Sequence, residues 1–129
     1  MGEDIIEKIP LNNGLTLDVY DKSRRVAGDR WLVHFVGAVT IDIERYYPDS
    51  ESAPALNAVK GALGDTVCYC VEKKSHFVDQ SEKDEVFKRL QNDFLNANLH
   101  YLSSPAFPPK LILRRYGEKT AMYGQANAG

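Results

Sequence analysis

The sequence predicts an α+β fold: a curled antiparallel meander of three or four strands, with one long amphipathic helix packed on one face and a short C-terminal helix. Two patterns lead to this prediction. Residues 31–43 alternate between two side-chain faces without a slip, and residues 81–98 repeat apolar side chains with the period of a helix. Strand-like and helix-like segments also occur in separate runs, which favours an α+β fold over a parallel α/β layout.

The composition is that of an ordinary soluble globular protein. The chain has 129 residues, of which 43% are hydrophobic and 26% charged, and this length is enough for one domain with a real core. We assign residues 1–116 to a single globular domain and the small, polar residues 117–129 to a flexible tail. The net charge of −2 argues against general affinity for nucleic acid.

The first two strands are predicted to form a hairpin. Residues 4–11 are strand-like, and Pro10 places that strand at an edge because proline cannot donate to a ladder. Residues 12–14, Asn-Asn-Gly, are a strong turn signal. Residues 15–20 then alternate as a second strand, and residues 22–29 form a polar connection to the third.

The third strand, residues 31–43, carries the most information. Its odd-numbered side chains form a wholly apolar face, interrupted only by Gly37, while the centre of its even face is also mostly apolar. Strands usually have about 5–6 residues, so this one should curl or change partner partway. Because the alternation is kept throughout, we expect a bend at Gly37 rather than a bulge.

The second half of the chain alternates between helices and one strand. Residues 53–63 are predicted to form a helix that ends at Gly64, and residues 66–78 a fourth strand. On that strand one face shares apolar side chains, namely Val67, Tyr69, Val71 and Phe77.

The helix over residues 81–98 is the clearest in the chain. Asp79 or Ser81 can cap its start. Its apolar stripe consists of Val86, Phe87, Leu90, Phe94 and Ala97. We expect this stripe to pack against the odd face of the third strand and against Leu15, Leu17 and Val19. Residues 109–116 follow as a short helix between Pro109 and Gly117, although Leu111–Leu113 fit a strand equally well.

Three groups of residues are candidate sites. His34 lies on the even face of the third strand and can act as a catalytic base only if a carboxylate or nucleophile lies within reach. Arg24, Arg25 and Arg30 concentrate positive charge in one connection, and guanidinium groups suit phosphate or carboxylate ligands. Each group also has an interpretation without function: His34 as a half-buried packing residue, and the arginines as the solvated end of a hairpin.

Cys68 and Cys70 form the third group. On a strand both thiols face the same side, but a metal site needs two further ligands, so we expect packed thiols rather than a metal or redox centre. No cofactor and no nucleotide-binding or catalytic motif is predicted from the sequence.

The even-face residues Leu32, Val36 and Ala38 motivate the functional hypothesis, because they form an apolar patch if nothing covers them. We expect a small interaction or regulatory module without catalysis of its own, which forms a homo-oligomer or binds a protein partner through this face or an edge of its sheet. The alternative is a small-ligand or nucleotide-binding domain, or a small enzyme, that uses the arginines and His34. No signal-peptide pattern or membrane-spanning run is seen, so we expect a cytoplasmic location and no membrane partner.

Overall fold

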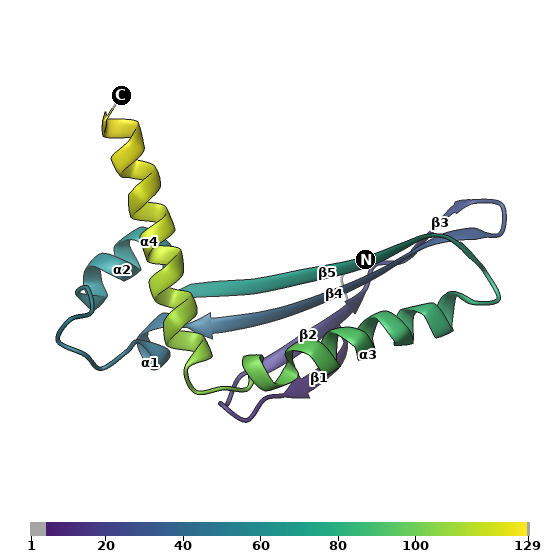
Figure 1. Ribbon diagram of the computed structural model, residues 1–129, viewed down its shortest axis with the longest axis horizontal. Coiled ribbons are helices and arrows are strands. Elements are labelled where there is room, and N and C mark those ends of the chain that lie inside the picture. Colours follow the sequence, from purple (N-terminus) through teal and green to yellow (C-terminus); the bar gives the residue numbers. More distant parts are fainter. Residues whose placement is uncertain (1–4, 129) are drawn as a thin grey trace. The chain divides into compact units, whose positions relative to one another are not determined.

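The computed structural model describes residues 5–128, with side chains through residue 121. The elements in chain order are β1 (Ile5–Pro10), β2 (Thr16–Asp21), β3 (Arg24–Ala27), β4 (Arg30–Asp42), α1 (Ile43–Tyr46), α2 (Leu56–Leu63), β5 (Thr66–Asp79), α3 (Lys83–Leu102) and α4 (Phe107–Ala128) (Figure 1). They belong to two compact units. The first unit comprises the chain up to Val39 and residues 69–103, and the second comprises residues 40–68 and those from Ser104 onward. Residues 1–4, part of the acidic N-terminal segment, lie outside the described residues.

The predicted α+β class is confirmed, and the described residues form an antiparallel sheet of five strands. β1 pairs with β2, and β2 pairs with β4 in a regular antiparallel register from Leu17 opposite Val39 to Asp21 opposite Phe35. This regular register confirms that the third predicted strand keeps its parity through Gly37. A Cβ atom on Gly37 would lie 3.3 Å from side-chain atoms of both Leu17 and Phe35, so the glycine allows these side chains to approach the strand closely.

The strand missed by the sequence analysis is β3, which lies within the predicted polar connection. Arg24 pairs with Leu32 and Arg25 with Trp31. Between β2 and β3 the Lys22 N–H donates to the His34 carbonyl at 2.9 Å, so β3 continues β2 along the same edge of β4. A four-residue segment such as β3 has little intrinsic strand preference, and the free edge of β4 supplies the pairing.

The core of the first unit lies between the odd face of β4 and α3, as predicted. Phe35 is fully buried, with its ring centroid 6.0 Å from that of Phe87 and 5.5 Å from that of Phe94. The Gln91 side chain donates to Glu7 at 2.9 Å. The Asn13 amide donates to the Leu102 carbonyl at 2.7 Å, which anchors the end of α3 to the β1–β2 turn. Figure 1 accordingly shows α3 alongside β1 and β2.

Two boundaries in this unit differ from prediction. α3 begins at Lys83 and continues to Leu102 rather than residue 98, because no proline or glycine interrupts it. Asp79 accepts hydrogen bonds from the N–H and hydroxyl of Ser81 at 3.0 Å, so it organises the turn before the helix. These hydrogen bonds, ahead of the Arg30 charge, lower the pKa of Asp79 below its usual value.

The second unit packs α1, α2 and α4 with the ends of β4 and β5. Its fully buried apolar side chains include Ile41, Ile43, Val59, Phe107, Leu111 and Ile112. β4 ends at Asp42, whose carboxylate accepts from the Glu44 N–H at 3.1 Å and caps α1. α2 ends at Gly64, at a φ of 87°, so the glycine predicted to stop this helix does so with positive φ.

The C-terminal helix is confirmed and is longer than predicted. α4 begins at Phe107 and continues through Gly117 to Ala128, so the strand alternative for Leu111–Leu113 is wrong, and residues 117–128 belong to the helix. Pro108 and Pro109 lie in its first turn, where the missing N–H groups cost nothing. One glycine inside a helix costs only about 1 kcal/mol, and no proline follows Gly117 to stop the helix.

Candidate functional site

The first unit leaves one face of its sheet without a helix. In an antiparallel pair, residues directly opposite each other point to the same side of the sheet. Arg24 therefore shares a face with Leu32, and Tyr20 shares it with Val36. Among the described residues of this unit, the only helix is α3, on the opposite face (Figure 1). We call the helix-free surface the open face; it consists of the even-numbered side chains of β2, β3 and β4 in this unit and of β5 from Cys70 to His76.

The predicted apolar patch on the open face is mostly covered. Leu32 is 8% exposed and Val36 6% exposed, while Ala38 is half-buried. An interface role for Leu32, Val36 and Ala38 stays a prediction, but their burial removes the exposed patch on which it was based.

His34 lies at the centre of the open face and has a carboxylate partner. Its Nε2 atom lies 2.6 Å from Glu72 Oε2, and its backbone N–H donates to Ser23 Oγ at 2.9 Å. The hydrogen bond from His34, and then the charge of Lys74, hold the pKa of Glu72 below its usual value. The carboxylate that His34 needs comes from β5, which pairs with β4 on the side opposite β2. Catalysis by His34 stays a prediction.

The three predicted ligand-binding arginines do not converge. Arg24 and Arg25 are neighbours on β3 and therefore point to opposite faces of the sheet. Arg30 Nη1 lies 3.4 Å from Asp79 and its Nε atom 3.8 Å from Asp29. Arg24 belongs to the open face through its pairing with Leu32. Arg30, two residues before Leu32 on β4, lies on the same face by alternation but is paired with acidic side chains at the end of the strand.

A small concavity lies where Arg24 meets the far end of β5. It has a volume of about 150 Å³ and is lined by Arg24, Val26, Leu32, His76 and Phe77. Phe77 is 71% exposed, and its φ of 56° is the only positive value among the described non-glycine residues. The prediction that Phe77 lies on the same face as Val67, Tyr69 and Val71 is wrong, because this backbone conformation breaks the alternation, and Val78 is buried instead.

The conformation of Phe77 leads to a prediction about stability. A left-handed conformation costs an L-residue about 1–2 kcal/mol, and glycine is free of this cost. We expect Phe77→Gly to leave the protein as stable or raise its unfolding free energy by up to about 1 kcal/mol, despite the loss of an aromatic ring. Urea denaturation measures this, with Phe77→Ala as the control that keeps the strain. A loss above about 1 kcal/mol for Phe77→Gly relative to Phe77→Ala contradicts it.

The cysteines do not pack as predicted. Cys68 and Cys70 are both exposed and lie on the edge strand β5. No group of three histidine, cysteine, aspartate or glutamate side chains suited to hold a metal ion occurs among the described residues.

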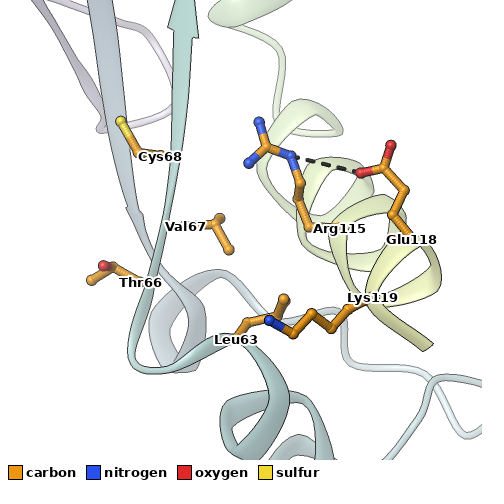
Figure 2. A pocket seen from close by; sticks show the side chains of 7 residues that line it. All are labelled: Leu63, Thr66, Val67, Cys68, Arg115, Glu118 and Lys119. Atoms are coloured by element: carbon orange, nitrogen blue, oxygen red, sulfur yellow. Dashed lines mark ion pairs between the residues drawn. The ribbon is translucent and has the colours of Figure 1, made fainter. Parts of the chain in front are cut away.

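The second unit has a concavity of its own, of about 420 Å³, between β5 and α4. Figure 2 shows its lining side chains, which come from the end of α2, the start of β5 and one side of α4. Arg115 Nε lies 4.0 Å from Glu118 of the next turn. This intrahelical pair offsets the positive charge of Arg115, and Lys119 also lines the concavity.

Comparisons with known proteins do not indicate a function. No known family, curated protein or solved structure matches the chain. Over the described residues, every helix is too short or too polar to cross a membrane.

Proposed function

We propose that the protein is an interaction module without catalysis of its own, which self-associates through the outer edge of β5. The observation that carries this proposal is the length and position of that strand. β5 has 14 residues and pairs with β4, while the other edge of β4 is occupied by β2 and β3. No described strand pairs with the outer edge of β5, and a long unpaired edge is a template for strand addition.

The other edge of the sheet is less suited to this role. β1 has six residues, ends in Pro10 and is interrupted by a register shift after Ile5. A proline and a bulge are features that discourage strand addition. Between Tyr69 and Phe77, β5 has no proline or glycine. Its N–H and C=O groups can therefore continue the antiparallel ladder into a second sheet.

The charges on β5 select a second copy of the same strand. In an antiparallel pair related by a two-fold axis, residue i faces residue j and residue j faces residue i. An axis through Lys73 places Glu72 of each chain opposite Lys74 of the other. Both residues point to the open face and are about half exposed, so two complementary charge pairs form at once. The cost is one Lys73–Lys73 pair, whose long side chains can diverge into solvent.

A charge exchange tests this pairing. We expect Lys74→Glu to weaken the dimer about tenfold or more, because each cross-strand pair then brings two carboxylates together. The double exchange Glu72→Lys with Lys74→Glu should restore association, since the charges again alternate. Sedimentation equilibrium across the micromolar range measures both dissociation constants.

The matched control is Lys88→Glu, the same charge change on the exposed surface of α3, which should leave the dimer intact. A native chain that is strictly monomeric up to about 100 µM overturns the self-association. A dimer whose dissociation constant responds equally to Lys74→Glu and Lys88→Glu overturns the role of the β5 edge.

A further inference from the structure

We propose that the concavity at the far end of the open face binds a small carboxylate with an apolar body. Its walls come from β3, β4 and β5, and the five residues that line it are Arg24, Val26, Leu32, His76 and Phe77. All five belong to the first unit. The proposal does not depend on self-association, because it rests on different side chains.

The size and lining of the concavity limit what can enter it. Leu32 forms a buried apolar floor, while Val26 and Phe77 are 46% and 71% exposed and stand beside it. A volume of about 150 Å³ corresponds to about five water molecules at about 30 Å³ each. One aromatic ring or a short branched chain therefore fills it, and a nucleotide does not.

The charge of the concavity sets the sign of the ligand. Arg24 presents a planar array of N–H donors that matches the two oxygens of a carboxylate. Among the described residues, no carboxylate lines the concavity and no ion pair of Arg24 occurs, whereas Arg30 is held by Asp79. His76 adds a ring N–H donor. Donors at the rim above an apolar floor are the arrangement that small amphipathic anions require.

The backbone supports the same assignment. At Phe77 the chain adopts a φ of 56°, a conformation that disfavours L-residues and persists only when the surroundings impose it. It breaks the alternation of β5, so that the adjacent residues His76 and Phe77 both line the concavity. A regular strand would send these two side chains to opposite faces. The unusual conformation at Phe77 therefore forms one wall of the proposed site.

Benzoate and benzamide form a matched pair of probes, with the same ring and different charge. We expect benzoate, titrated to about 20 mM into the ¹⁵N-labelled chain, to shift the amide resonances of Val26, Leu32, His76 and Phe77 in a saturable manner. Benzamide should bind at least about tenfold more weakly, because it lacks the charge that Arg24 recognises.

A second experiment measures benzoate binding to variants of the two neighbouring arginines on β3. Arg24→Leu should abolish the saturable shifts, while Arg25→Leu, on the opposite face of β3, should leave benzoate affinity within about twofold. Arg24→Gln replaces Arg24→Leu if the latter does not fold, as judged by circular dichroism. The absence of saturable benzoate shifts, equal binding of benzoate and benzamide, or equal losses from both arginine substitutions each overturns the proposal.

Discussion

Replacement of Phe35 by alanine should destabilise the protein by about 3–5 kcal/mol. The Phe35 side chain is fully buried and contacts the rings of both Phe87 and Phe94. Its removal leaves a cavity between β4 and α3 and breaks the principal contact between sheet and helix. Because total stabilities are only about 5–15 kcal/mol, the loss is a large fraction of the whole. Thermal and urea unfolding measure it, with an expected fall in Tm of roughly 10–20 °C.

Phe77→Ala is the matched control for this experiment, since it deletes the same ring at a position that is 71% exposed. It should cost less than about 1 kcal/mol, because little buried surface is lost. If the unfolding free energy of Phe35→Ala lies within about 1 kcal/mol of that of the control, the aromatic cluster does not hold α3 on the sheet.

Replacement of Phe107 by alanine should have a similar cost in the second unit. Phe107 is 1% exposed at the start of α4, so we expect a loss of about 3–5 kcal/mol. The predicted single domain adds a further expectation. β4 and β5 each contribute residues to both units, so a defect in one unit should lower the unfolding transition of the other.

Trp31 makes this coupling measurable, because it is the only tryptophan of the chain and lies in the first unit. In Phe107→Ala, the midpoint seen by tryptophan fluorescence should fall as far as the midpoint seen by far-UV circular dichroism. A fluorescence midpoint that stays at the native value, while circular dichroism shows an earlier transition, would assign the two units to separate domains.

The accuracy of the sequence-based prediction depended on how local the signal was. The hairpin turn at residues 12–14, the alternation of β4 and the apolar stripe of α3 all depend on neighbouring residues. Each is present in the structure, although Ala97, the last member of the predicted stripe, is exposed. The odd-face core was predictable for the same reason. β3 was not, because four residues without a strong preference become a strand only when the edge of β4 is beside them.

The candidate site was also predictable only in its local features, and not in its long-range contacts. Arg24 and His34 could be singled out because their chemistry is visible in the sequence. Their partners could not: Glu72 is 38 residues from His34. His76 and Phe77 are farther still, 44 to 53 residues, from the open-face residues Leu32 and Arg24. A strand register that joins β4 to β5 brings them together, and no local pattern encodes that register.

The sequence by itself determined the class of the fold, the parity of β4 and the face on which α3 packs, because hydrophobic periodicity is a property of consecutive residues. Only the tertiary structure decided which face of the sheet stays open, that the outer edge of β5 has no described partner, and that Phe77 and Arg24 line one concavity. These features depend on which strands become neighbours, and long-range pairing of strands sets that order.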